Sequence, residues 1–432
     1  MMRSGQRGLG RRLRVAAMAA AVAAVGVGVA SRDEERAGGE RSTIPFLPNN
    51  FPHLNASGLS ATFSTEGFID QRGEYFQAQG ANGRSCATCH IAQDAWSINP
   101  DTIRRLFALT SGTHPIFNPL DANNPDVPLL TVQERWAGYS MMLTRGLFRR
   151  GGAPRADREW DVVAVDDPHG FANLNRIVQW RRVMPTINFH LGSATVNWDG
   201  GNSIGTDQLA GLVNQATRNV TGGQQGPPAP PEVITDIVAF ESALSTAQIF
   251  SFSAGLLNAG GARGGPEALS RMTRIAGRFD LFDAWIHSRN RQRAQIARGQ
   301  ELFNNPNPGG GSCLGCHNSA NNGTNVSNVL FDIGTASAEA RTPDLPLYTF
   351  RNRATNEERQ LTDSGRGNVT GLWRDLGRFK TPTIRALAAR APYFHNGIAE
   401  TLEDVVRHYE THLGFVFTNR ERADLVAFLK AL

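Results

Sequence analysis

All four cysteines of this 432-residue chain lie in two short segments of the same form. Residues 86–90 read CATCH and residues 313–317 read CLGCH, so each segment is a Cys-x-x-Cys pair followed directly by His. The rest of the chain contains no cysteine.

Three kinds of chemistry use paired cysteines. A disulfide suits an exported protein but leaves the adjacent histidines without a role. One shared zinc ion needs four tetrahedral ligands, but it does not explain why both segments follow one formula. Covalent attachment of c-type haem uses two thiols for the porphyrin and the next His for the iron. The sequence therefore predicts two covalently bound c-type haems, attached at Cys86, Cys89, Cys313 and Cys316 and ligated by His90 and His317. We call residues 86–90 the first haem unit and residues 313–317 the second haem unit.

The positive net charge comes from one end of the chain. The sequence holds 44 Lys and Arg against 39 Asp and Glu, and five of the arginines and none of the acids lie in residues 1–30. The remaining 39 basic and 39 acidic residues balance, which argues against a nucleic-acid partner. The arginines precede an apolar run, residues 15–30, that is too short to span a bilayer. Residues 1–30 are therefore interpreted as an export signal to the periplasm, with an uncleaved anchor as the alternative.

Few segments alternate strictly between apolar and polar residues, so we expect a mainly α-helical protein with long ordered loops. Residues 31–45 are charged and Gly-rich and are expected to be a disordered linker. The two halves share an order of haem unit, Pro-Thr-Ile, Gly turn and final helix, which indicates a duplication. We expect two tandem cytochrome c-like haem domains at residues 46–270 (the first half) and 271–432 (the second half). The first half has the longer segment between its haem unit and its Pro-Thr-Ile, so it carries an insertion.

The second haem iron needs a sixth ligand if it only transfers electrons. No methionine follows Cys313, which excludes a Met ligand from within the second half. Thr401 and Asp404 predict the start of a helix. One face of that helix is apolar and carries Tyr409 as its one side chain able to bind iron. Tyr409 is the candidate ligand, with a plain core tyrosine as the alternative; His408 and His412 fall on another face.

The repeat predicts a different outcome for the first haem. Tyr409 is 12 residues after Gly397, and 12 residues after Gly200 is Leu212, which cannot bind iron. The first iron is therefore expected to be open to a small oxidant. Three histidines of the first half could still close it, and they are His114, His169 and His190. The repeat also pairs Trp198 with His395, and Trp198 is either core or a relay for electrons.

Beyond the haem units, residues 378–410 (RFKTPTIRALAARAPYFHNGIAETLEDVVRHYE) and 196–201 (VNWDGG) resemble the bacterial di-haem cytochrome c peroxidase family, which includes MauG. The resemblance implies an electron-transferring C-terminal haem and a peroxidatic N-terminal haem. Peroxidases of the family carry Met where this chain has Tyr409, whereas MauG has Tyr. The resemblance also places Trp198 between the haems. It further suggests a calcium ion held partly by backbone oxygens of residues 390–392.

The same resemblance gives candidate catalytic residues. The family glutamine that follows the tryptophan is matched by Gln208, and the family catalytic glutamate falls at Arg218. No acid lies between Asp207 and Glu232, and an arginine stabilises negative charge but is a poor base. Trp198, Gln208 and Arg218 are the catalytic candidates, and efficient classical peroxidase activity is in question.

We therefore expect an exported di-haem oxidoreductase that reduces hydrogen peroxide at the N-terminal haem. Its electrons would come from a small cytochrome c, a cupredoxin or the side chain of a protein substrate. The alternatives are a non-catalytic di-haem electron-transfer cytochrome and a haem-based sensor or gas-binding protein.

Overall fold

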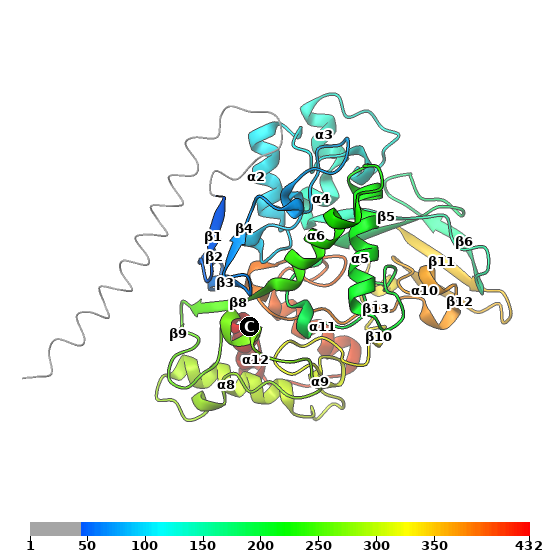
Figure 1. The fold of residues 1–432 in the computed structure, drawn as a ribbon. Coiled ribbons are helices and arrows are strands. Elements are labelled where there is room, and N and C mark those ends of the chain that lie inside the picture. The colour runs from blue at the N-terminus through cyan, green and yellow to red at the C-terminus, as the bar shows by residue number, and fades with distance from the viewer. Residues whose placement is uncertain (1–44) are drawn as a thin grey trace, which may run out of the picture. The chain divides into compact units, whose positions relative to one another are not determined.

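The computed structural model describes residues 45–432, so the expected export signal and nearly all of the expected linker lie outside the described residues. Helices and small sheets alternate along this part of the chain (Figure 1). The α-helices are α2 (Pro100–Thr110), α3 (Val132–Gly138), α4 (Ser140–Arg145), α5 (Gln208–Arg218), α6 (Pro231–Ala243), α7 (Pro266–Ser270), α8 (Arg291–Asn304), α9 (Cys313–Cys316), α10 (Gly367–Thr370), α11 (Leu402–Leu413) and α12 (Asn419–Ala431).

The strands of the described residues form five small sheets. The strands are β1 (Phe46–Pro48), β2 (His53–Asn55), β3 (Gly58–Ser64), β4 (Phe68–Asp70), β5 (Leu147–Gly152), β6 (Trp160–Asp166), β7 (Ile177–Arg182), β8 (Leu244–Ser251), β9 (Gly255–Leu256), β10 (Leu330–Phe331), β11 (Leu347–Asn352), β12 (Glu358–Leu361) and β13 (Phe379–Lys380). Helix makes up 34% and strand 18% of the structure, so the expectation of a mainly helical protein holds only in part.

The insertion of the first half explains much of the unexpected strand content. It contributes α2, α3 and α4 and then β5, β6 and β7. Strand β6 pairs antiparallel with β11 of the second half, and β11 also pairs with β12, giving the order β12-β11-β6. Trp160, Tyr348 and Phe350 are fully buried in the core of this sheet. Its strands are far apart in the sequence but side by side in Figure 1.

Each half has a core built around its last helix. In the first half, α5 and α6 pack with Tyr75 and Trp96. In the second half, α8, α11 and α12 pack with Phe303 and Phe428. The predicted final helices of both halves are confirmed as α6, which begins at Pro231, and α12.

The limits of the two predicted domains stay a prediction. Residues 44–432 form one compact unit rather than two. Ala254, Leu257 and Ala262 precede the expected boundary at residue 270, yet they pack in the core around α8 and α12. The halves are thus closely joined.

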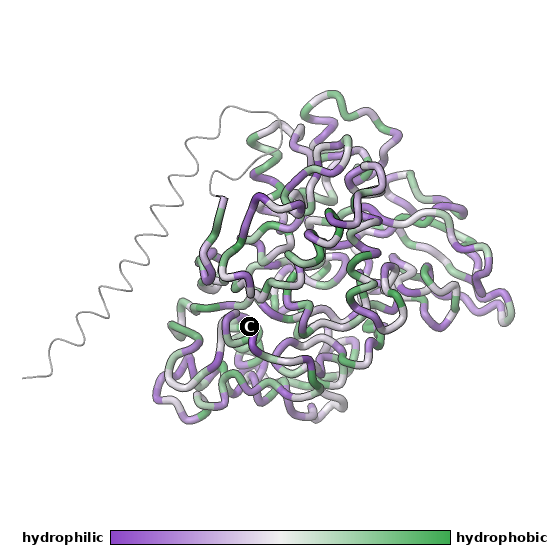
Figure 2. The backbone as a smooth tube through the Cα atoms, in the orientation of Figure 1, coloured by the Kyte–Doolittle hydropathy of each residue, from purple (hydrophilic) through white to green (hydrophobic). Residues whose placement is uncertain are grey.

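Apolar segments are short and interrupted by polar ones along the described chain (Figure 2). Accordingly, none of the helices in residues 45–432 is both long and apolar enough to cross a membrane.

Candidate haem sites

The two haem units have the same local structure. Cys86–Thr88 form a 3₁₀ turn and Cys313–Cys316 form α9, so each pair of cysteines is presented by one short helical turn. His90 Nδ1 lies 3.0 Å from the carbonyl oxygen of Trp96, and His317 Nδ1 lies 2.7 Å from that of Gly323. Since a carbonyl can only accept, Nδ1 donates in both cases. This tautomer makes Nε2 the ligating nitrogen, and the carbonyl fixes the ring orientation.

Burial also favours the ligating state of both histidines. Desolvation lowers the pKa of His90 to about 4, and the carbonyls of Trp96 and Met184 only partly oppose it. Desolvation likewise lowers the pKa of His317 to about 4, against the carbonyl of Gly323. Both imidazoles are therefore neutral at pH 7, which is the form that binds a metal.

A cavity lies beside the second haem unit. Cys313, Cys316 and His317 line it together with Tyr409 of α11. The rest of its lining is mostly apolar, including Leu425 and Leu429 of α12. Lys380 and Arg390 add positive charges that suit the two propionates of a haem. The residues present therefore fit a covalently attached haem.

Helix α11 brings Tyr409 to this cavity as the sequence predicted. Thr401 is the N-cap and forms a capping box with Asp404. The predicted apolar face of α11 lines the cavity through Leu402, Val405, Val406, Tyr409 and Leu413. Burial raises the pKa of the Tyr409 phenol above its usual range, so an iron ion would be needed to hold it as phenolate.

The other two histidines of α11 face away from that lining, as expected. His408 Nε2 donates to the carbonyl of Ile333 at 2.7 Å, and His412 is exposed. The two imidazoles stack on each other, with ring centroids 5.6 Å apart.

The matching helix of the first half, α5, has a different register from the one the sequence comparison used. Its N-cap is Asp207, seven residues after Gly200, whereas Thr401 is four residues after Gly397. Tyr409 is eight residues after its N-cap, and the eighth residue after Asp207 is Gln215.

Leu212 corresponds to Val406 in this register, and it is buried in the core that Cys86 contacts. The prediction that this face of α5 is hydrocarbon near the first haem unit agrees with that packing. The residue matched to Tyr409 is corrected to Gln215, because the loop before α5 is longer.

The three histidines that could close the first iron have other contacts. His190 Nε2 lies 3.2 Å from the carbonyl of Leu269 and donates to it. His114 Nδ1 accepts from the backbone N–H of Ile116 at 3.2 Å. His169 packs edge-on against Trp180, with ring centroids 5.8 Å apart.

The catalytic candidates occupy three different environments. Trp198 lines the cavity of the second haem unit, and its indole N–H donates to the carbonyl of Arg182 at 2.8 Å. Gln208 opens α5, and its amide donates to the carbonyl of Ser193 at 3.1 Å. Arg218 ends α5 with an exposed side chain. Their catalytic roles stay predictions.

Trp198 shares the cavity of the second haem unit with a residue that follows the first. Ser97, seven residues after His90, lines the same cavity as Trp198 and His317. The Trp198 indole also meets the imidazole of His395, its partner in the repeat, with centroids 6.3 Å apart and the rings steeply inclined. This position suits a relay between the halves.

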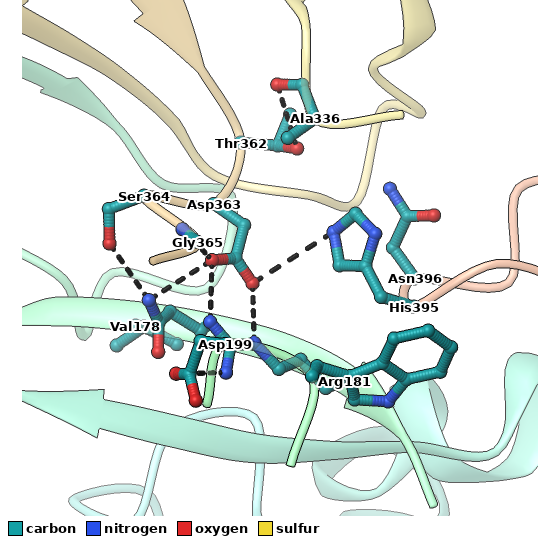
Figure 3. Close-up of polar contacts among 12 residues, drawn as sticks. Val178, Arg181, Asp199, Ala336, Thr362, Asp363, Ser364, Gly365, His395 and Asn396 are labelled. Carbon is teal, nitrogen blue, oxygen red and sulfur yellow. Dashed lines mark hydrogen bonds and ion pairs between the residues drawn. The ribbon is translucent and has the colours of Figure 1, made fainter. Parts of the chain in front are cut away.

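A buried polar network holds His395 and the turn that carries Trp198 (Figure 3). Arg181 donates to Asp199 at 2.5 Å and to Asp363 at 2.8 and 2.9 Å. His395 Nε2 lies 3.9 Å from the Asp363 carboxylate. Desolvation lowers the pKa of His395 to about 3, so its ring is neutral.

Glu241 is a functional candidate that sequence reasoning missed. It lies on α6, is 2% exposed, and among the described residues its Oε2 has no hydrogen-bond partner. Desolvation raises its pKa from 4.5 to about 8. Its charge also raises the pKa values of Cys86 and Tyr75, which places it close to the first haem unit.

The duplication could have pointed to Glu241. The final helices align as IVAFESAL and LVAFLKAL, so Glu241 falls at the position of Leu429. Leu429 lines the cavity of the second haem unit. The first half therefore has the carboxyl group of Glu241 where the second half has the apolar Leu429. Such a difference between two copies of a repeat indicates a function specific to one copy.

The backbone oxygens expected to bind calcium already have a partner. The guanidinium of Arg182 donates to the carbonyls of Arg390 and Ala391 at 3.2 and 3.3 Å. Within residues 45–432, no three His, Cys, Asp or Glu side chains gather closely enough to hold a metal ion. The Arg182 guanidinium therefore occupies the carbonyls at which calcium was expected, so these contacts disfavour the ion, and calcium at residues 390–392 stays a prediction.

Comparison with known proteins supports the resemblance. No family model matches the chain. Cytochrome-c peroxidase IdrP1 of Pseudomonas sp. (strain SCT) is 30% identical over 173 residues, which cover 35% of this chain and 43% of the relative. Methylamine utilization protein MauG of Methylophilus methylotrophus is 23% identical over 369 residues, covering 80% of this chain and 93% of that protein.

The chain is thus similar to di-haem cytochrome c peroxidases and to MauG. It spans less than half the length of the peroxidase relative named above. A solved structure of a MauG-like protein associated with microbial copper homeostasis covers 91% of this chain, with 15% identity and a TM-score of 0.41. The similarity favours c-type haem as the cofactor of the two haem units.

Proposed function

We propose that this chain is an exported, periplasmic di-haem oxidoreductase that reduces hydrogen peroxide at the first haem unit with electrons passed through the second. One observation carries the proposal. Tyr409 and His317 line the same cavity at the second haem unit, while the corresponding helix of the first half, α5, carries Leu212 and Gln215 at the positions matched to Val406 and Tyr409. One site is closed by a phenol and the other offers hydrocarbon and a weakly ligating amide.

Bound haem supplies one-electron redox chemistry at both units and peroxide cleavage where the iron is open. Different side chains of the protein would have different roles. Neutral His90 and His317 act as proximal ligands, and Tyr409 closes the second site. Trp198 relays electrons between the halves.

Peroxide cleavage also needs a group that can move a proton between the two oxygens. Gln208 and Arg218 on α5 are our candidates for positioning peroxide and stabilising negative charge. Glu241 is a candidate acid, because its raised pKa of about 8 keeps it protonated at neutral pH. It thereby offers a proton in a chain that lacks the family glutamate at position 218.

The electron donor is proposed to be a small cytochrome c or a cupredoxin. The peroxidase relatives favour the cytochrome, and the tyrosine ligand shared with MauG favours oxidation of a protein side chain as the second possibility. The opposing candidate is an electron-transfer cytochrome with both irons six-coordinate.

Electron paramagnetic resonance of the ferric holoprotein decides between these functions. An enzyme with one open haem shows a high-spin signal beside a low-spin one, and we expect this pair. Two low-spin signals would mean a carrier. Peroxide consumption with a reduced cytochrome donor then distinguishes a peroxidase from an enzyme that modifies a protein.

The relay is tested by Trp198→Phe. We expect slower electron exchange between the haems after partial reduction, with both haems still attached. Trp285→Phe serves as the control, because Trp285 is buried in the core of the second half. Equal rates of electron exchange between the haems in wild type and Trp198→Phe would show that Trp198 has only a structural role.

A further inference from the structure

Arg182 brings a positive charge to a point where three chain segments meet. It ends β7 and is only 5% exposed. Its guanidinium donates to the carbonyl of Arg145 at 3.0 Å, at the end of α4, and to those of Arg390 and Ala391 at 3.2 and 3.3 Å. Of the two segments that the guanidinium contacts, the end of α4 belongs to the first half, and residues 390–391 belong to the second.

The backbone of the same residue holds the proposed relay. The Arg182 carbonyl accepts the indole N–H of Trp198 at 2.8 Å. Its N–H donates to the carbonyl of His395 at 2.6 Å. Side chain and backbone together therefore connect Trp198, the segment before His395 and the insertion of the first half.

Backbone carbonyls that converge on a buried cation are the usual setting of a structural calcium site. Here the cation is part of the chain. Burial lowers the pKa of Arg182 to about 10, which still leaves it charged at neutral pH. Asp94 is the acid that favours its charge, and Arg390 is a second positive charge that opposes it.

A divalent ion at the same carbonyls would be strongly disfavoured. It would lie beside the buried charge of Arg182 and the half-buried charge of Arg390, with no group of three or more acidic, His or Cys side chains in the described residues to offset them. Arg182 also lines the cavity of the second haem unit, where the anionic propionates of a haem favour keeping its charge.

We propose that Arg182 is the structural cation between the two haem units, so that this protein holds its halves and Trp198 in place without calcium. The inference depends on the two-haem assignment but not on peroxide reduction. Arg182 is a positioning residue, since it acts through Trp198 and through the carbonyls of the second half.

Calcium dependence is measured first on the wild-type holoprotein. We expect elemental analysis to find calcium far below one ion per chain. We also expect neither a chelator nor added calcium to change the melting temperature or the haem spectra. Stoichiometric calcium that stabilises the protein would overturn the proposal.

Arg182→Met then removes the charge while keeping much of the side chain's length. We expect the melting temperature to fall by about 5 °C, because three charged hydrogen bonds are lost. We also expect electron exchange between the haems to slow severalfold, and Arg182→Lys, which keeps a charge, to recover part of both losses.

The matched control is Arg351→Met, at an exposed ion pair on β11 that lies outside this site. Arg351→Met should change neither the melting temperature nor the rate of electron exchange between the haems. If Arg182→Met equalled wild type in both stability and electron exchange, Arg182 would not be the structural cation. None of these measurements uses peroxide, so the proposal can fail while the proposed function stands.

Discussion

At the residue scale, Tyr409 is the proposed sixth ligand of the second haem iron, and its phenol lines the cavity beside His317. Tyr409→Phe would remove the proposed oxygen ligand, while the proposed thioether bonds at Cys313 and Cys316 would be unaffected. We expect a changed absorption and resonance spectrum of one haem, with both haems still attached by mass spectrometry. The control is Tyr393→Phe, since Tyr393 lines the same cavity but donates to the carbonyl of Leu387 at 3.1 Å. Identical spectra for wild type and Tyr409→Phe would exclude Tyr409 from the ligands.

The burial of Glu241 makes the stability of the folded protein depend on pH. Its pKa rises from 4.5 to about 8 on folding, so between these values the folded state holds a proton that the unfolded state has released. The free energy of unfolding therefore falls as pH rises through this window. In Glu241→Gln this fall disappears, and relative to wild type the variant gains on the order of 2 kcal/mol between pH 4.5 and 7.

Denaturant titrations of the holoprotein across pH 4.5–8 measure this difference. The exposed Glu66 provides the control, and Glu66→Gln should keep the pH dependence of the wild type. If Glu241→Gln and wild type show parallel pH profiles, the carboxyl group is ionised in the folded protein and is not the acid proposed for peroxide cleavage.

At the element scale, α11 and α12 begin with equivalent capping boxes but have different neighbours. Thr401 caps α11, which carries Tyr409, and Thr418 caps α12. Thr401→Ala and Thr418→Ala should each lower the free energy of unfolding by about 1 kcal/mol, because one backbone donor loses its acceptor. Only Thr401→Ala should also disturb the haem spectrum, since it loosens the helix that holds the proposed ligand. An equal spectral change in both variants would show that this effect is not specific to α11.

The same elements show what sequence could and could not predict. The cap and apolar face of α11 follow from local rules, and the structure confirms them. The register predicted for α5 was wrong, because the sequence of the helix does not determine the length of the loop between Gly200 and its N-cap. Strand β6 was missed because its partner, β11, lies in the other half, and such long-range pairing leaves little local signal. Glu241 was missed because burial of an acid depends on tertiary packing.

At the scale of the whole molecule, the buried network around Asp363 joins the two halves. Asp363 lies in the second half, with its side chain 2% exposed, and accepts from Arg181 and Gln179 of β7 in the first half (Figure 3). Burial alone would raise its pKa, but the charge and hydrogen bonds of Arg181 hold the pKa below its usual value. The stability this provides is present above pH about 4 and is lost as the pH falls through the lowered pKa.

Asp363→Asn removes one of the two carboxylates that face Arg181 and leaves a buried guanidinium only half compensated. We expect it to lower the free energy of unfolding by about 3 kcal/mol at pH 7. The exposed pair of Arg155 and Asp157 offers the control, and Asp157→Asn should leave the free energy of unfolding as in wild type. Because the lost contacts connect the halves, the single unfolding transition expected of the wild-type unit should separate into two in Asp363→Asn. Calorimetry of the holoprotein measures both effects. One unshifted transition in Asp363→Asn would mean that the cores, rather than this network, hold the two halves together.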